Sequence, residues 1–344
     1  MSKMCNNKMN QKIAFSVINK YDMEVNKVEA SVNELLEETQ FDGIEGSKLI
    51  FEEFEVYDRP TFVEYLKAGW QIEMRAAIDF SAVSGQAGAE GSLHNPGDSN
   101  GYEQALRAIG SVLESYSTAD AWSFFGFGSE TSGETPGDGT IVTPDDSTTR
   151  PLHSPLEEVV DAVDDPSTFA VTVDRRADPN GSGVDSLVAQ YRAAATNVQP
   201  GEQSRLAPVL RAIMNSIKKN EQIYYVAPLL IAGPIEDLSE AKEVMVQLSR
   251  YPCQLVAIGV ADADFSQLEE LNVGVLKDDN NRACVRRMVS FVRLSDALAK
   301  GSLADQVLTS LPDSMCAHCE RVSFRLRPGG QASMAVSFSE LNLN

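Results

Sequence analysis

From residue 61 onward, segments with continuous apolar runs alternate along the chain with segments whose apolar residues recur at helical spacing. Continuous apolar runs predict strands at 72–80, 121–127, 169–173, 224–231, 254–260 and 289–292. Apolar residues at helical spacing predict helices at 102–116, 184–195, 206–218, 238–248 and 295–311, the last ended by Pro312. This alternation is typical of a doubly wound, mostly parallel sheet with helices on both faces. The run 224–231 is the most apolar and is expected at the centre, although Pro228 counts against that place because proline cannot donate to the ladder.

Two other parts of the chain lack this pattern. Residues 1–58 contain three short strand-like segments at 13–18, 28–36 and 49–57, which cannot bury a core alone and must pack on the rest of the chain or on a partner. Residues 129–165 are rich in Ser, Thr, Gly, Asp and Pro and hold ten acidic residues against one basic residue, so we expect an acidic surface insertion. We expect a tail at 326–344.

The charge of the chain excludes several classes of function. The 344 residues include 29 Lys and Arg against 50 Asp and Glu, which gives a formal net charge of −21. Such a chain is repelled by phosphate backbones, so we expect no nucleic-acid partner. The longest apolar stretch, 224–235, is too short to span a bilayer, and the first residues lack the apolar core of a signal peptide. We expect an intracellular, cytoplasmic protein, with the cytoskeleton, a cilium or a membrane as places of association.

The cysteines and histidines form no recognisable catalytic or metal-binding motif. The five cysteines are scattered, which does not indicate a disulfide framework. Cys316 and Cys319 have CxxC spacing around His318, but a structural zinc site needs about four ligands, so chance cysteines near a helix end are favoured over a redox or metal role. His94, a loop or capping residue, is far in sequence from the other histidines, and the sequence has neither a phosphate-binding loop nor a nucleophile elbow. Trp70 and Trp122 are expected in the core.

Three loops are predicted at the carboxyl ends of the strands, where ligands bind in such sheets. They span 79–85, 202–208 and 231–234 and carry hydroxyl and carboxylate side chains. Such oxygens suit a hard cation such as Mg²⁺.

The same loops lie within a longer resemblance to a known family. Residues 61–325 resemble the C-terminal von Willebrand A-type domain of copines through the stretches 62–69, 77–81, 92–96, 102–105, 125–128, 206–208, 256–261, 264–265 and 289–292. The resemblance implies a six-stranded, mostly parallel α/β sheet, preceded in residues 1–58 by a short β remnant of a C2 domain. The first C2 domain and most of the second are expected to be absent, unless Met1 is not the true start. Because only Asp22 hints at a calcium loop, we expect no C2-type calcium binding by the remnant.

The family's domain often holds a metal ion at an adhesion site, and this chain departs from that pattern. Asp79 and Ser81 match, and Ser204 stands at a position that is usually Thr. Val83 and Ala232 stand where the family has an oxygen ligand and an Asp. Losing one of two carboxylates should severely weaken the binding of a divalent ion, so we expect a degenerate, empty site and no cofactor. A weak or rearranged Mg²⁺ or Ca²⁺ site is the alternative.

Five further residues complete the expected binding face around that site. These are Ser84, Gly85, Arg205, Gly233 and Asp237. Two of them, Ser84 and Asp237, lie near enough in sequence to substitute in principle for the lost ligands. Ser84, however, is expected to point to the opposite side from Val83, and Asp237 lies past a proline and is expected at a helix start.

Three functions compete. We favour a non-enzymatic protein–protein interaction module, a copine-like adaptor or structural subunit of a larger assembly, whose partner has a basic surface. The alternative that the resemblance implies is calcium-dependent phospholipid binding with recruitment of target proteins to membranes. This alternative needs the C2 domains of a longer isoform; otherwise the chain meets a membrane only indirectly. The third, a ubiquitin ligase with a RING, is rejected because the eight zinc ligands cannot be found.

Overall fold

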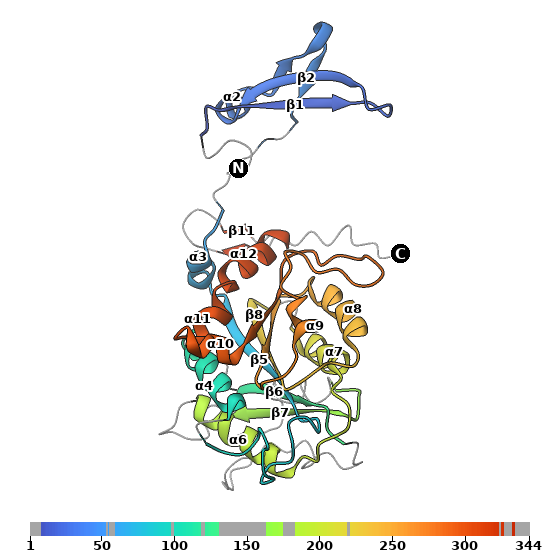
Figure 1. Cartoon of the computed structure of the whole chain (residues 1–344). Helices are drawn as coiled ribbons and strands as arrows, with labels where there is room; N and C mark the ends of the chain where they lie inside the picture. The colour runs from blue at the N-terminus through green and yellow to red at the C-terminus, as the bar shows by residue number, and fades with distance from the viewer. Residues whose placement is uncertain are drawn as a thin grey trace. The chain divides into compact units, whose positions relative to one another are not determined.

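The computed structural model describes residues 8–52, 54, 59–97, 100–117, 121–130, 163–174, 183–218, 221–322, 325–326 and 332–333. The chain forms two units, Met1–Arg59 and Pro60–Asn344 (Figure 1). Each unit is described by itself.

The N-terminal unit consists of two antiparallel hairpins and a short helix. Its elements are β1 (Lys12–Ile18), β2 (Glu24–Ser31), α2 (Val32–Glu37), β3 (Gln40–Asp42), η1 (Ile44–Gly46) and β4 (Lys48–Ile50). The strand-like segment expected at 28–36 is wrong in its second half. Ser31 and Glu34 form a capping box, in which each side chain bonds the other residue's backbone N–H, and this starts a helix directly after the strand.

A six-stranded sheet forms the centre of the second unit. Its strands are β5 (Gln71–Asp79), β6 (Ala121–Phe127), β7 (Thr168–Asp174), β8 (Ile223–Ile231), β9 (Cys253–Gly259) and β10 (Val289–Arg293). They lie in the order β10-β9-β8-β5-β6-β7, all parallel except β7, which pairs antiparallel with β6. The predicted mostly parallel, doubly wound sheet is confirmed. Trp70 and Trp122 are buried, as expected.

Pro228 does not keep its strand from the centre of the sheet. β8 pairs with β5 on one side and β9 on the other. The pairing with β5 is interrupted beside the proline, because Met74 pairs with Val226 and the next pair is Ala77 with Leu229. The missing N–H therefore falls at a gap in the ladder, which makes a central proline tolerable.

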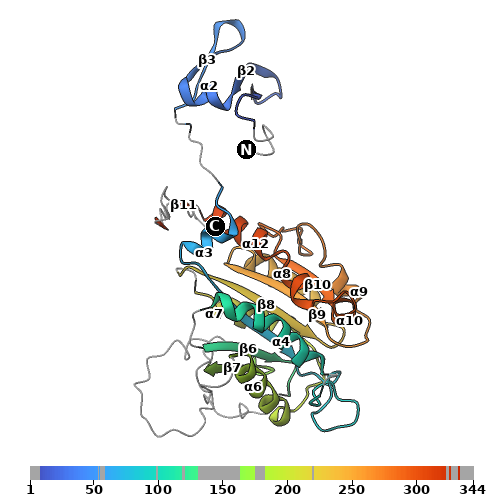
Figure 2. The same ribbon diagram turned by 90° about the vertical axis from the view of Figure 1, so that its left-hand side faces the viewer.

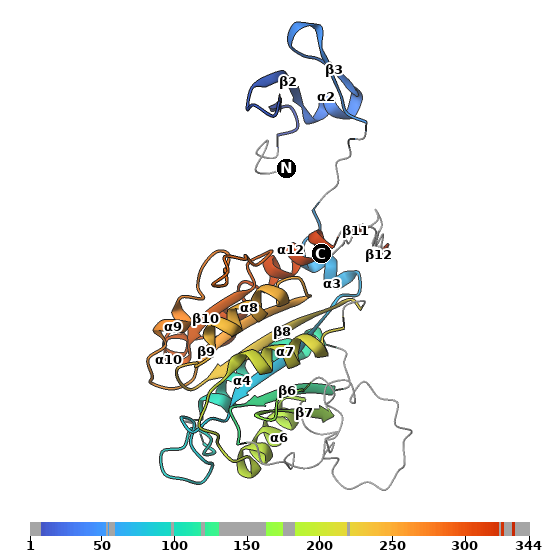
Figure 3. The ribbon, with the colours of Figure 1, turned by 90° about the vertical axis from the view of Figure 1, so that its right-hand side faces the viewer.

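Helices cover both faces of the sheet, and each face has its own apolar core (Figures 1, 2 and 3). One face carries α3 (Phe62–Lys67), α4 (Gly101–Leu113) with η2 (Glu114–Tyr116), α6 (Gly183–Asn197), α10 (Leu294–Ala299), α11 (Leu303–Leu308) and α12 (Leu311–Arg321). The other carries α7 (Leu206–Ser216), α8 (Leu238–Leu248) and α9 (Ser266–Glu269).

The single closing helix expected at 295–311 is wrong. Three helices occupy this region, and Gly301, with a φ of 101°, lies in the turn between the first two. Pro312 lies in the first turn of α12 and so helps to begin a helix. Proline is tolerated there because the first N–H groups of a helix have no partner within the helix.

Two predicted segments lie largely outside the described residues. Of the expected insertion at 129–165, the structure describes 129–130 and 163–165. In the expected tail, β11 (Arg325–Leu326) pairs antiparallel with β12 (Ala332–Ser333). Within the described parts of the chain, no helix is both long and apolar enough to cross a membrane.

Candidate functional site

The loops at the carboxyl ends of β5 and β8 meet around Asp79. Asp79 is the last residue of β5, and Ala232 follows β8 directly. The strand order changes direction between β5 and β8, so this is the switch point at which open α/β sheets bind ligands. The structure therefore brings Asp79, Ser81, Ser204 and Ala232 together from three separate loops.

Hydrogen bonds from the surrounding loops occupy the Asp79 carboxylate. Oδ1 accepts from the Ser81 N–H at 2.9 Å. Oδ2 accepts from the Ser204 hydroxyl and from the Ala232 N–H, both at 3.1 Å. The side chain is fully buried, and this burial raises the pKa of Asp79, while the bonds from Ser81, Ala232 and Ser204 lower it. The carboxylate thus has protein donors on both oxygens.

An apolar side chain lies at the mouth of this site. Val83 is 53% exposed. A Cβ placed on Gly233 would lie 3.0 Å from a methyl carbon of Val83, so the two loops are in close contact there. Val83 therefore presents methyl groups where an oxygen ligand would be needed.

The donor set does not fit a divalent cation well. Three side chains, those of Asp79, Ser81 and Ser204, supply four oxygens and a single carboxylate charge. Mg²⁺ and Ca²⁺ take six or more oxygens and rely on carboxylates for charge. At position 232 the chain turns a backbone N–H toward Asp79, where the family's pattern would supply a second carboxylate.

Ser84 lies behind the loop and is not part of an exposed binding face. It is 1% exposed, its hydroxyl donates to the Asp79 carbonyl at 2.9 Å, and its oxygen lies 2.7 Å from the Tyr102 hydroxyl. Gly85 has a φ of 75°, and a Cβ there would lie 3.2 Å from the Ser92 Cα. Both residues shape the loop, and Ser84 cannot replace a lost ligand without breaking its bond to the Asp79 carbonyl.

Asp237 caps a helix instead of facing the Asp79 site. Its two oxygens accept from the N–H groups of Leu206 and Ala207, at 2.7 and 2.8 Å, and so satisfy the first turn of α7. The neighbouring Arg205 is partly exposed and lies 4.0 Å or less from carboxylates of Asp165, Asp237 and Glu240. Arg205 is accordingly held by acidic neighbours on the rim.

A buried aromatic cluster beside Asp79 was not predicted from the sequence. His94 is stacked between Phe80 and Tyr102, with ring centroids 4.7 and 4.6 Å away, and its Nδ1 lies 2.9 Å from the Tyr191 hydroxyl. Burial lowers the pKa of His94 to about 4, so the ring is neutral at pH 7. A single histidine in a polar loop gives no signal of this packing.

The cysteine pair of α12 is buried. Cys316, His318 and Cys319 are each 8% exposed or less, and burial raises the pKa of the Cys319 thiol. Among the described residues, no three or more His, Cys, Asp or Glu side chains are grouped so that they could hold a metal ion.

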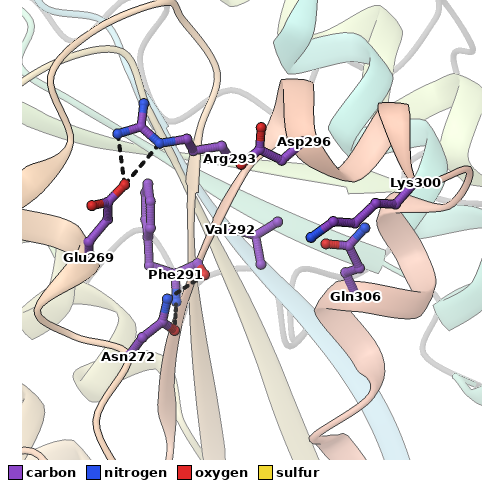
Figure 4. Close-up of a pocket in the computed structure, with 8 residues that line it drawn as sticks. All are labelled: Glu269, Asn272, Phe291, Val292, Arg293, Asp296, Lys300 and Gln306. Atoms are coloured by element: carbon purple, nitrogen blue, oxygen red, sulfur yellow. Dashed lines mark hydrogen bonds and ion pairs between the residues drawn. The ribbon is translucent and has the colours of Figure 1, made fainter.

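A separate pocket of about 340 Å³ lies at the β10 edge of the sheet (Figure 4). Val292 lies at its centre, with Lys300 and Gln306 on one side and the Glu269–Arg293 ion pair on the other. It does not include the Asp79 loops.

The sheet order, the two helical layers and the loops around Asp79 define a von Willebrand A-type fold. Comparison with known proteins gives the more particular assignment. The copine family model matches residues 159–327. Protein BONZAI 1 of Arabidopsis thaliana is 27% identical over 277 residues, 77% of this chain and 43% of that protein. Protein BONZAI 2 of the same plant is 27% identical over 282 residues, 79% of this chain and 43% of that protein.

These matches confirm the resemblance to copines, and residues 159–327 are the part that the copine family model matches. The chain spans less than half the length of these curated relatives.

Proposed function

We propose that this chain is a non-enzymatic protein–protein interaction module, a copine-like adaptor or structural subunit, whose Asp79 site works without a bound cation. The observation that carries the proposal is the occupied state of the Asp79 carboxylate, which accepts from Ser81, Ser204 and Ala232. A cation would have to displace these donors and lose hydration water, and it would gain only one carboxylate as an anionic ligand.

The rest of the site supports an interaction by surface contact. Val83 adds an exposed apolar side chain at the centre of the face, and Arg205 is surrounded by acidic side chains on its rim. An apolar centre with a charged rim is the usual anatomy of a protein interface. The net charge of −21 favours a partner with a basic surface.

Calorimetry with Mg²⁺, Mn²⁺ and Ca²⁺ tests the metal-independent part of the proposal, with Asp79→Asn as the matched variant. We expect no binding tighter than about 1 mM, roughly −4 kcal/mol, in either protein. Tighter binding by the parent chain that Asp79→Asn abolishes would overturn this part. Val83→Glu then tests the face itself. It should weaken capture of a partner in EDTA, and capture that requires added calcium and anionic vesicles would instead support the phospholipid-binding alternative.

A further inference from the structure

Three arginines converge at the end of the sheet opposite to Asp79. Arg250 follows α8, Arg286 precedes β10, and Arg321 is the last residue of α12. Arg286 Nη2 donates to the carbonyls of Tyr251, at 2.8 Å, and of Cys253, the first residue of β9. Arg321 donates to the Arg250 carbonyl. Figure 1 shows α12 at this end of the sheet.

Among the described residues of the second unit, no acidic side chain forms an ion pair with any of the three arginines: no carboxylate oxygen lies within 4.0 Å of a guanidinium nitrogen of Arg250, Arg286 or Arg321. The pKa of Arg321 is lowered by burial and then by the positive charges of Arg286 and Arg250. This is unexpected in a chain with 50 acidic against 29 basic residues.

The position of each arginine has a partial structural explanation. Arg250 and Arg321 lie at the ends of α8 and α12, where cations interact favourably with the helix dipole. The helix dipole explains each position singly, but it does not explain why three cations share one place with no counterion among the described residues.

Arg286 supplies a fixed positive charge beneath the other two. It is 6% exposed, and its Nη1 donates to the Ser314 hydroxyl at 2.7 Å. Its Nε is buried and makes no hydrogen bond in the described structure. Its carbonyl partners and the Tyr224 ring, whose centroid lies 5.6 Å from Arg286 Cζ, carry no full negative charge, so the positive charge of Arg286 has no counterion among the described residues.

We propose that Arg250 and Arg321, above the fixed charge of Arg286, form a binding site for a phosphate group. Both outer side chains are exposed, and Arg287, also exposed, lies next to Arg286 in the sequence. A phosphate group is compact, carries up to two negative charges and offers several acceptor oxygens in the geometry that guanidinium groups match. The carboxylates of an acidic peptide each bring one charge and are spaced along the chain, so they suit a single convergent point less well. This site is independent of the proposed function of the Asp79 face.

Titration of the full chain with inorganic phosphate, at constant ionic strength against chloride, tests the proposal. The test variant is Arg250→Gln with Arg321→Gln, and Arg286 is kept because its bonds hold the fold. The matched control is Arg107→Gln with Arg211→Gln, two exposed arginines whose charges are paired with Asp185 and Glu240. We expect saturable binding that the test variant weakens at least tenfold and the control leaves unchanged.

Binding also predicts a rise in melting temperature with about 10 mM phosphate over chloride, because a ligand that binds only the folded state stabilises it. The absence of saturable binding, or equal affinity in the test variant, would overturn the proposal. An arm with O-phospho-L-serine distinguishes the sources. Tighter binding of the ester than of inorganic phosphate indicates a phosphorylated side chain as the ligand, whereas the reverse order indicates free phosphate.

Discussion

The side chain of Asn272 pairs with the backbone of Phe291 on the edge strand β10 (Figure 4). The Phe291 N–H donates to Asn272 Oδ1 at 2.8 Å, and Asn272 Nδ2 donates to the Phe291 carbonyl at 3.0 Å. β10 is the last strand on its side of the described sheet. The carboxamide therefore occupies backbone groups that would otherwise be open to a strand of another molecule.

We expect Asn272→Ala to lower the free energy of unfolding by about 1–2 kcal/mol and to increase self-association. Chemical denaturation and light scattering over a concentration series would measure the two effects. Asn280→Ala is the matched control, because its exposed carboxamide contacts the Glu243 side chain and no backbone of the sheet. Self-association that stays at the level of the control would show that the edge is protected by other means.

The central part of the fold and the gathering of the Asp79 loops follow from the sequence pattern. Apolar runs gave the six strands, and parallel strands bring the loops after β5 and β8 to one edge although Asp79 and Ala232 are 153 residues apart. Asp79, Ser81 and Ser204 therefore lie together at this edge of the sheet.

The roles of individual loop residues could not be predicted in this way. The Tyr102 partner of Ser84 and the contact of Asp237 with α7 depend on local backbone geometry that residue type does not specify. Pro312 could end or begin a helix, since proline suits both the first turn and the residues after the last. The choice was decided by tertiary packing, as α12 buries Met315 and Cys319 in the core.

Asp237→Ala should destabilise the second unit by about 1–2 kcal/mol, since two N–H groups of the first turn of α7 lose their acceptor. Asp237→Asn should lower the stability less than Asp237→Ala, because its one carbonyl oxygen can still accept a hydrogen bond from one of these N–H groups. Thermal or chemical denaturation measures the difference, with Glu236→Ala as the neighbouring acidic control. An equal loss of stability in Glu236→Ala and Asp237→Ala would argue against a specific capping role of Asp237.

His94 should make stability depend on pH between about 4 and 6.5. In the unfolded chain the imidazole titrates near 6.5, whereas in the fold burial lowers its pKa to about 4. The stabilisation is complete above 6.5 and is lost as the pH falls toward 4, because only the unfolded state binds the proton in that window. The loss reaches at most about 3 kcal/mol.

His94→Phe keeps an aromatic ring between Phe80 and Tyr102 and removes the titration. Its unfolding free energy should change less than that of the parent chain between pH 7 and 5, and the difference between the two proteins isolates His94. This comparison is needed because burial of His318 lowers its pKa too, while the raised pKa of Asp79 acts in the opposite direction. Tyr191→Phe, which removes the bond to Nδ1 and keeps the imidazole, should retain the pH dependence.

Breaking the buried ion pair on β5 should lower the free energy of unfolding more than replacing both of its residues by apolar ones. Glu73 Oε2 lies 3.0 Å from Arg75 Nη2, both side chains are 8% exposed or less, and the Arg75 guanidinium lies over the Tyr225 ring. Glu73→Gln leaves a buried cation without its counterion, and we expect a loss of about 3 kcal/mol. Replacing both residues by Leu should cost less than Glu73→Gln alone. Chemical denaturation tests this. The exposed pair Arg107 and Asp185 is the control, and breaking it should lower the free energy of unfolding by less than about 1 kcal/mol.

Restoring the two missing oxygens tests why the Asp79 site would lack a cation. In Val83→Ser with Ala232→Asp, a second carboxylate lies near the buried Asp79, so like-charge repulsion should make the variant less stable than the parent chain in EDTA. Mg²⁺ should offset that repulsion and raise the melting temperature, with calorimetric binding at about 1 mM or tighter. Val83→Ser alone, which adds an oxygen and no charge, should gain no such binding. If the double variant stays insensitive to Mg²⁺, the packing of the loops, and not the loss of these two ligands, keeps the site closed.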